Sequence, residues 1–429
     1  MQVAPPRHSL LDSPNPTYSL TVGPRRRRIR MTKHATQVAA LAALLLLVQS
    51  SAAFAIAFPH TQHQVFPTDT SNISTVNRNP AGLPFVPKGL HLNLTTFVVN
   101  LDQGATATEK TGAQFAGKKY SANLLGPVPY LYAGYVGDEW SVVVYNSMEI
   151  GNPDAVSFEP ALLDMRSAGL GFVEADLEVI STVFTYNVAV GWRINDQLGV
   201  AVVGRVGTRW EQAEVTVPSP YGDSYGKAKA RGHALGGSFG IGYQPTDRWF
   251  FSANVTTALR INPYVSLSTL DKKSGPAADL ASGIALSTVN RPTEIPWTTS
   301  AGARYALTPG WMLRLGVNVE FWGETFDETK QNSISGQIGT SVDATESLTL
   351  HTGFNYNTSI IDKDKDPGIS YGGDLLGFTV GAGYEVAKGH KLDAGVMLNV
   401  RFQDDTEDLG FVDGYQNILV SSLSYTVTL

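Results

Sequence analysis

Two kinds of side chain alternate along the stretch Trp249-Phe250-Phe251-Ser252-Ala253-Asn254-Val255-Thr256-Thr257-Ala258-Leu259-Arg260-Ile261. The parity that runs from Trp249 to Ile261 is almost wholly apolar, whereas the other parity carries Ser252, Asn254, Thr256 and Arg260. Successive side chains of a β-strand point to opposite faces, so the stretch predicts a strand with one apolar and one polar face. In a membrane β-barrel these faces contact lipid and line the lumen.

The same alternation recurs along the chain. In the runs 311–321 and 392–402 the charged residues Arg314, Glu320, Asp393 and Arg401 all stay on the polar parity. A water-soluble β-sandwich also alternates, but it seldom sustains a dozen strands of this length. From about Gly89 to the end, the chain repeats one plan of a strand, a tight turn, a second strand and a longer connection.

Tight turns with Gly, Asn, Asp or Pro separate the paired strands, because these residues suit hairpin geometry. They are Gly137-Asp138, Asn195-Asp196, Pro245-Thr246-Asp247, Thr308-Pro309-Gly310, Asp343-Ala344-Thr345 and Lys388-Gly389. The longer connections are expected over 101–126, 149–180, 212–232, 262–297, 324–331, 359–374 and 404–416. About fourteen strands, with short turns at one rim and long loops at the other, predict an all-β, transmembrane antiparallel β-barrel. Trp140, Trp249 and Trp311 each follow a short turn and predict an aromatic girdle at the membrane interface.

Composition excludes several classes of protein. Charged residues are only 16% of the chain and the formal net charge is -6, so nucleic acid is not an expected partner. The chain has no cysteine, which excludes disulfides and thiolate metal sites. Motifs for phosphate loops, serine hydrolases and zinc proteases are absent, so no catalytic residue, metal or cofactor is predicted.

One enzymatic alternative is kept. His351 and Asn355 share the lumen parity of one predicted strand, and a serine on a neighbouring strand would complete a barrel-borne hydrolase. The other interpretation is a merely polar lumen.

The chain begins with a predicted signal peptide over residues 1–55. Lys33 and His34 precede an apolar run, and Ala53-Phe54-Ala55 offers small residues for cleavage, so the mature protein is expected to begin near Ile56. We expect translation to start at Met31, with residues 1–30 as an over-long reading frame; the alternative is a signal peptide with a long, basic n-region. Past Ile56 no apolar run is long enough for a transmembrane helix. Residues 56–88 are rich in proline and lack alternation, whereas 89–429 form the barrel, and a lumen of about fourteen strands is wide enough to hold the earlier segment as a hatch, or plug.

Three motifs carry a resemblance that covers nearly all of the mature chain. Asn77-Arg78-Asn79-Pro80-Ala81, Arg193-Ile194-Asn195-Asp196 and Pro292-Thr293-Glu294-Ile295-Pro296-Trp297 resemble segments of the FadL-type (OMPP1/FadL/TodX) outer-membrane transporters of long-chain fatty acids and other hydrophobic compounds. The resemblance implies a barrel closed by a hatch that contains Asn79, Pro80 and Ala81. It also implies capture of ligand at extracellular loops, transfer to an inner pocket, and release by hatch rearrangement, through the lumen or a lateral opening.

Candidate ligand-binding residues fall into two groups. The connection that contains Leu162, Leu163 and Phe172 is unusually apolar, as is 280–289, and such patches indicate a binding surface or a lid. Arg205, Arg209 and Arg260 are predicted to face the lumen near the loops and could receive a carboxylate. Alternatively, these arginines pair with lumen acids such as Glu320 or Glu385, while Arg304 and Arg314 lie nearer the short turns and suit anchoring of the hatch.

The sequence therefore predicts a monomeric bacterial outer-membrane barrel, surrounded by outer-membrane lipid, that takes up hydrophobic small molecules. Long-chain fatty acids are the expected ligands. Aromatic hydrocarbons are the alternative, and a diffusion porin for polar solutes or an adhesive barrel are the competing classes.

Overall fold

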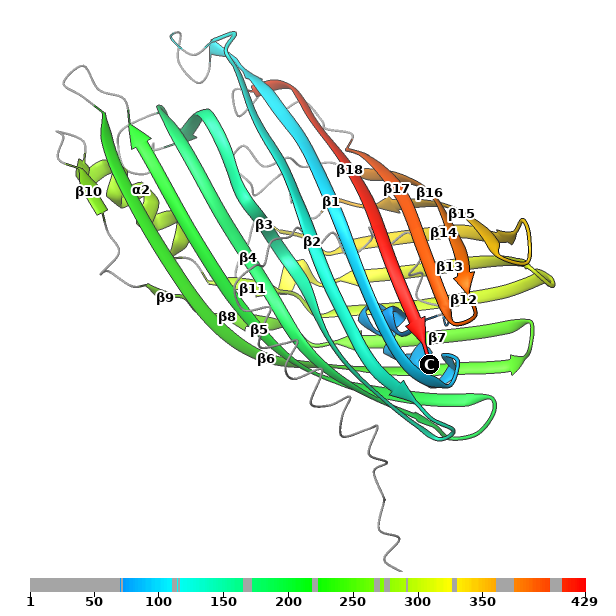
Figure 1. The fold of residues 1–429 in the computed structure, drawn as a ribbon. Helices are drawn as coiled ribbons and strands as arrows, with labels where there is room; N and C mark the ends of the chain where they lie inside the picture. Colours follow the sequence, from blue (N-terminus) through cyan, green and yellow to red (C-terminus); the bar gives the residue numbers. More distant parts are fainter. Residues whose placement is uncertain are drawn as a thin grey trace, which may run out of the picture.

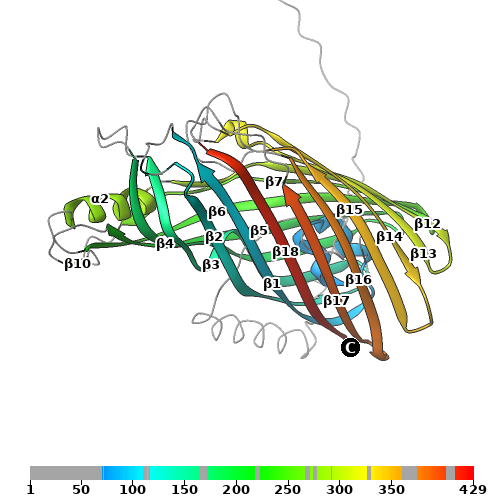
Figure 2. The same cartoon turned by 90° about the horizontal axis from the view of Figure 1, so that it is seen from above.

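The computed structural model describes residues 70, 72–109, 114, 116–164, 172–217, 223–265, 271–273, 278–290, 292–325, 330–359, 374–401 and 411–429. The predicted signal peptide and residues 56–69 of the predicted hatch lie outside this part of the chain. Among the described residues, fourteen antiparallel strands form one closed barrel (Figures 1 and 2). They are β1 (Gly89–Ala107), β2 (Lys119–Val136), β3 (Trp140–Asp164), β4 (Phe172–Arg193), β5 (Leu198–Val217), β6 (Ser224–Thr246), β7 (Trp249–Thr256), β12 (Thr298–Thr308), β13 (Trp311–Glu320), β14 (Ser333–Asp343), β15 (Leu348–Asn357), β16 (Leu375–Ala387), β17 (His390–Arg401) and β18 (Phe411–Thr428).

The barrel closes where β1 pairs with β18, in a register that joins His91 to Thr428 and Val99 to Val420. Each strand pairs with its neighbour in the chain, except that β7 pairs with β12. The segment between those two strands contains β8 (Leu259–Ile261), β9 (Tyr264–Val265), β10 (Asp271–Lys273), helix α2 (Ala278–Val289) and β11 (Thr293–Ile295). The predicted fold class is thus confirmed.

All six predicted tight turns are confirmed. They connect β2 to β3, β4 to β5, β6 to β7, β12 to β13, β14 to β15 and β16 to β17. Gly310 and Gly389 adopt φ values of 81° and 76°, a region that side chains disfavour, which explains glycine at these two turns. The short turns share one rim of the barrel, so the long connections lie at the opposite rim.

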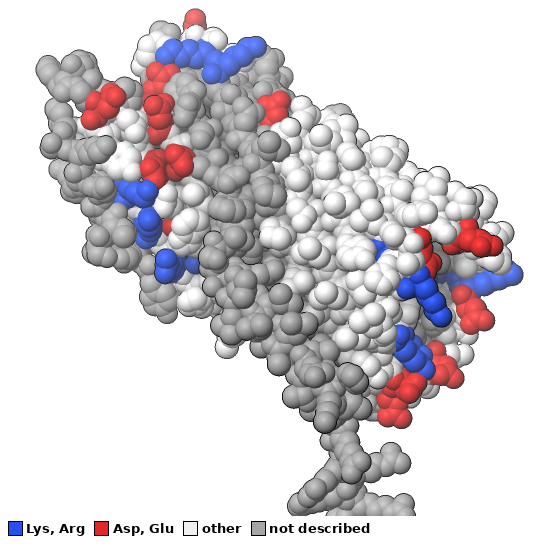
Figure 3. Space-filling model, in the orientation of Figure 1, with Lys and Arg blue, Asp and Glu red and all other residues white. Residues whose placement is uncertain are grey.

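The outward parity of the strands is apolar, and the charged residues gather towards the two ends of the barrel (Figure 3). Trp140, Trp249 and Trp311 are each at least 40% exposed on this outer surface, beside the short turns. Trp192 stacks on Trp140 with ring centroids 5.4 Å apart. The predicted aromatic girdle is therefore present at one level of the wall, as expected for a barrel in an outer membrane. Among the described helices, none has both the length and the apolar character needed to cross a membrane.

Strand length differs around the barrel, and here the predicted connections were wrong. β3 has 25 residues and β5 has 20, whereas β7 has 8. Much of the ranges 101–126, 149–180 and 212–232 is strand, not loop. The reason is visible on β5 and β6, where the outward parity becomes polar at Gln212, Glu214 and Lys227. Beyond the membrane the ladder continues without a lipid face, so the alternation that marks the strands disappears.

Candidate functional site

Residues 72–86, called the hatch segment below, lie inside the barrel at the short-turn rim. They form two 3-10 helices, η2 (Ile73–Asn77) and η3 (Pro80–Phe85). In Figure 2 their blue ribbon lies within the barrel. Glycines on the lumen faces of β5 and β6 make room for them. A Cβ atom on Gly240 would lie 2.7 Å from the backbone nitrogen of Ala81, and one on Gly199 would lie 2.8 Å from Pro84 Cβ. Only glycine at these positions allows such a close approach.

Three polar contacts tie the hatch segment and Thr70 to the wall. Arg193 donates to the Pro84 carbonyl from Nε and Nη2, at 2.9 and 2.6 Å. Asn254 Nδ2 donates to the Arg78 carbonyl at 2.6 Å. Arg304 donates to Thr70 Oγ1 at 2.5 Å, in agreement with the anchoring role that the sequence suggested for this arginine.

A fourth contact follows the segment. Lys88 pairs with Asp138 in the β2–β3 turn, and the hydrogen bond and charge of the lysine lower the pKa of the Asp138 carboxyl.

The Asn79-Pro80-Ala81 motif is buried in this contact. Asn79 precedes η3 without forming a side-chain cap, and neither its Nδ2 nor its Oδ1 has a hydrogen-bond partner although the residue is 1% exposed. Pro80 occupies the first turn of η3, where its missing N–H has no cost. A buried amide without partners disfavours this arrangement by roughly 1–3 kcal/mol. The buried Asn79 amide thus opposes this position of the segment, whereas the contacts with the wall favour it.

A group of buried side chains, which we call the inner apolar cluster, surrounds η2. It joins Ile73 and Val76 of the hatch segment to lumen-facing residues of strands on one side of the barrel. These residues include Phe97, Val99, Tyr130, Tyr132, Tyr145, Met148, Leu375, Met397, Ile418 and Val420. A lumen that carried polar solutes would be polar at this level, whereas this side of the lumen is apolar.

The ladder between β2 and β3 is interrupted beside this cluster. The strands pair from Val136↔Ser141 to Tyr132↔Tyr145, and the next pair is Asn123↔Ser157. At the edge of the interruption nearer the short-turn rim, the Leu131 N–H donates to the side chain of Asn146, at 2.7 Å, instead of to a β3 carbonyl. We call the unpaired stretch the β2–β3 gap.

Two prolines explain the gap. Residues of one parity in a β-strand direct their N–H groups to the same neighbouring strand. Leu131 directs its N–H to β3, so residues 129 and 127 would do the same, but Pro129 and Pro127 have no N–H. Asn146 Nδ2 instead donates to the Pro129 carbonyl at 3.3 Å. β3 adds irregularities of its own in its pairing with β4, including one between Asn152 and Val156.

Side chains of the inner apolar cluster border the gap on the lumen side. Tyr130, Tyr132, Tyr145 and Met148 belong both to the cluster and to the strand segments next to the gap. Tyr132 and Tyr145 stack with ring centroids 5.4 Å apart on the short-turn side of the gap. The Tyr130 hydroxyl donates across the gap to the Met148 carbonyl at 3.4 Å. An interrupted ladder thus separates buried apolar side chains from the lipid face of the wall.

At the loop end, α2 packs against the lumen face of β5 and β6. Ala281, Ile284 and Ala285 contact residues of the two strands, among them Ala213 and Ala228. This apolar segment was predicted as a loop surface or lid. It is a helix turned inward, and its residues Ala281, Ile284, Ala285 and Val289 are buried.

The three predicted arginines lie near this end. Arg209 is 1% exposed, pairs with Glu211 and donates to the Val289 carbonyl at the end of α2, at 3.3 Å. Arg260 pairs with Glu294 at 2.6 Å, between β8 and β11. Arg205 is 6% exposed on the lumen face of β5. Arg209 and Arg260 thus pair with acids of the chain, although with Glu211 and Glu294 and not with the Glu320 or Glu385 named from the sequence.

The predicted apolar connection around residues 160–172 is largely strand. Leu162 and Leu163 lie in β3, paired with Glu174 and Val173, and Phe172 is the first residue of β4. Their side chains lie outside the described part of the structure, so their predicted ligand contact stays a prediction.

The serine required by the hydrolase alternative is present. Ser341 of β14 lies opposite His351 of β15, with its Oγ 2.8 Å from Nδ1, and Arg314 donates to the same Oγ. The three side chains form a polar row on the lumen face. In the described part of the chain, no group of three or more His, Cys, Asp or Glu residues is placed to hold a metal ion.

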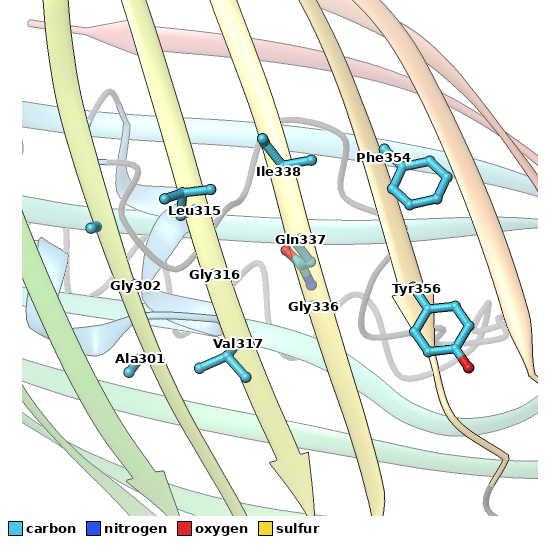
Figure 4. A pocket seen from close by; sticks show the side chains of 11 residues that line it. Ala301, Gly302, Leu315, Gly316, Val317, Gly336, Gln337, Ile338, Phe354 and Tyr356 are labelled. Atoms are coloured by element: carbon cyan, nitrogen blue, oxygen red, sulfur yellow. The ribbon is translucent and has the colours of Figure 1, made fainter.

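A hollow of about 600 Å³ lies on the outer face of β12 to β15. Figure 4 shows Leu315, Ile338, Phe354 and Tyr356 around it, and these four side chains are 40–47% exposed on the lipid-facing surface. Because the hollow opens towards lipid, it is separate from the lumen and its inner apolar cluster.

Known structures share this architecture. A FadL homologue of Pseudomonas aeruginosa matches with a TM-score of 0.57 and 16% identity, over 85% of this chain and 95% of its own. The toluene transporter TodX of Pseudomonas putida matches with a TM-score of 0.59 and 13% identity, over 86% and 97%. The chain has the FadL-type fold. The toluene transporter TbuX of Ralstonia pickettii aligns at 0.55 and 13% identity, over 83% and 93%. No family model and no curated protein sequence matches this chain.

Two features of this FadL-type barrel were missed in the sequence. Pro127 and Pro129 follow directly after the range 101–126, which was assigned to a loop, although two prolines of one parity in a strand signal an interrupted ladder. α2 was missed because its apolar residues resemble a loop patch and the segment has no clear polar face.

Proposed function

We propose that this FadL-type barrel takes up hydrophobic small molecules and delivers them through the β2–β3 gap into the membrane. The observation that carries the proposal is the position of the gap. It lies beside the inner apolar cluster, which includes Ile73 and Val76 of the hatch segment. The free energy of a hydrophobic ligand falls when it moves from water to such a surface, and it falls further when the ligand continues into lipid.

The hatch segment controls the path in this proposal. Ile73 and Val76 bury their side chains in the cluster, so a ligand that binds there competes with them. Displacement of η2 costs these apolar contacts, and the ligand replaces them. The buried Asn79 amide lowers the cost of displacement, because it regains hydrogen bonds when it leaves the wall.

Fatty acids remain the first ligands to test, with aromatic hydrocarbons second. The acid part of the proposal assigns the carboxylate to Arg205, a buried cation on the lumen face of β5. The apolar part depends on the inner cluster, which suits both ligand classes.

Hydrolysis is the weaker proposal. Ser341 Oγ donates to or accepts from His351 and also accepts from Arg314, and a serine that accepts from a guanidinium is a poorer nucleophile. We therefore assign this row to the lumen wall.

The proposal is tested in liposomes that contain the purified full-length barrel. We expect transfer of a fluorescent fatty acid or of toluene into the bilayer, and no swelling when polar sugars are added outside. Swelling at the rate of an open porin would contradict the proposal. Hydrophobic molecules retained by the purified barrel and identified by mass spectrometry give a second, independent measurement.

A further inference from the structure

Buried polar side chains line the lumen face of β14, β15 and β17. Asn355 and Asn357 of β15, Asn399 of β17 and Ser335 of β14 are between 1% and 7% exposed. The unpartnered polar atoms are Asn355 Nδ2, Asn399 Oδ1, Ser335 Oγ, and both Nδ2 and Oδ1 of Asn357. We call these four residues the amide cluster. Buried polar groups are normally hydrogen-bonded, so several unpartnered groups in one place require an explanation.

The strand register brings the cluster together. Gly377 of β16 pairs with Asn355 on one side and with Asn399 on the other, and Ser335 pairs with Asn357. The oxygens of Asn355 and Asn399 both occupy the space that a Cβ on Gly377 would need. Glycine at 377 thus lets two amides from different strands converge over one point of the lumen wall.

The amide cluster is continuous with the inner apolar cluster. Asn399 pairs with Ile418, while Met397 and Leu375 are the preceding lumen residues on β17 and β16. Ile418, Met397 and Leu375 all belong to the inner apolar cluster. The polar side chains of the amide cluster therefore lie next to the apolar surface of the inner apolar cluster.

Charge near the amide cluster does not favour an anion. The four side chains are neutral. Glu320 of β13 and Arg401 of β17 lie on neighbouring lumen rows, whereas Asp374 accepts a hydrogen bond from Tyr356 on the outer face. Arg401 interacts with Asp374, and Glu320 accepts from Trp322 Nε1 at 2.7 Å. One carboxylate and one guanidinium on the lumen rows leave no net positive charge, so the cluster suits a neutral polar group better than an anion.

We propose that the amide cluster binds the uncharged polar end of an amphipathic ligand, such as a hydroxyl group, whose hydrocarbon part lies on the inner apolar cluster. Amides offer both donors and acceptors, and a hydroxyl group uses one of each. The inference rests on the proposed uptake of hydrophobic molecules and adds ligands with a neutral hydrogen-bonding group to the fatty acids of that proposal. A site built for such a group discriminates strongly against ligands that lack it, because its own polar atoms then stay unpaired.

The test compares 1-dodecanol, dodecane and dodecanoate on the full-length barrel at neutral pH. Wild type should bind dodecanol more tightly than dodecane. Asn355→Leu and Asn399→Leu should each weaken dodecanol binding on the order of tenfold, the loss of about one hydrogen bond, and leave dodecane binding unchanged. Both variants should also be at least as stable as wild type to heat, since each removes a buried unpaired group.

Asn93→Leu is the matched control. The Asn93 amide is fully bonded, to Ser424, Thr426 and Thr95, so its loss should destabilise the barrel without changing the preference for dodecanol over dodecane. Equal losses for dodecanol and dodecane in the Asn355 and Asn399 variants would overturn the inference, as would a loss of dodecanoate binding in these variants as large as the loss of dodecanol binding. If wild type binds none of the three probes, the proposed uptake function itself fails.

Discussion

Closing the β2–β3 gap should slow the release of ligand into the membrane. The perturbation is the double variant Pro127→Val/Pro129→Val, which restores two N–H groups on the parity that points to β3. Each restored hydrogen bond contributes a net ~0.5–1.5 kcal/mol, so the pair favours a closed wall by about 1–3 kcal/mol. That free energy reduces the open population, and with it the rate of lateral release, by roughly 5- to 150-fold.

The assay measures the transfer of a fluorescent hydrophobic ligand from the barrel to the surrounding bilayer of a liposome. Ligand binding should be retained, because the variant leaves Tyr130, Met148 and the rest of the described inner apolar cluster in place. Pro245→Val, at the turn between β6 and β7, is the matched control and should not slow transfer. Hydrogen exchange reports whether the new amides at 127 and 129 are protected. An unchanged transfer rate in a variant whose new amides are protected would refute the lateral route.

Three further outcomes are expected. Deletion of residues 56–83 should leave a folded barrel whose conductance in planar bilayers rises, and unchanged conductance would place that segment outside the lumen. Gly240→Leu should destabilise the barrel by about 1–3 kcal/mol because a side chain there collides with Ala81, whereas Gly204→Leu, where a Cβ meets open space, should not; equal unfolding temperatures would contradict the close fit of the hatch segment. Arg205→Ala should weaken binding of a fatty acid by roughly 1–3 kcal/mol and spare its methyl ester, and equal losses for both would remove the carboxylate role.

The sequence by itself determined the barrel and its membrane band. Side chains on a strand alternate with a period of two, and lipid on one side and water or protein on the other impose apolar and polar parities that can be read directly, as in 249–261. Turn chemistry is equally local, so residues such as Gly310 and Gly389 marked the hairpins correctly. Where β5 and β6 leave the membrane, the parity signal ends although the strands continue, and the predicted boundaries failed there.

Only the tertiary structure decided which polar residues meet. Arg209 and Glu211 are two residues apart, but the pairing of Arg260 with Glu294 and the convergence of Asn355 and Asn399 over Gly377 depend on strand register, which alternation alone does not set. The prolines of β2 carried a local signal, yet their consequence, a gap beside the inner apolar cluster, required knowing that Leu131 faces β3. Lumen contacts join residues far apart in the chain, and their free energies are set by burial and register, which no short stretch of sequence encodes.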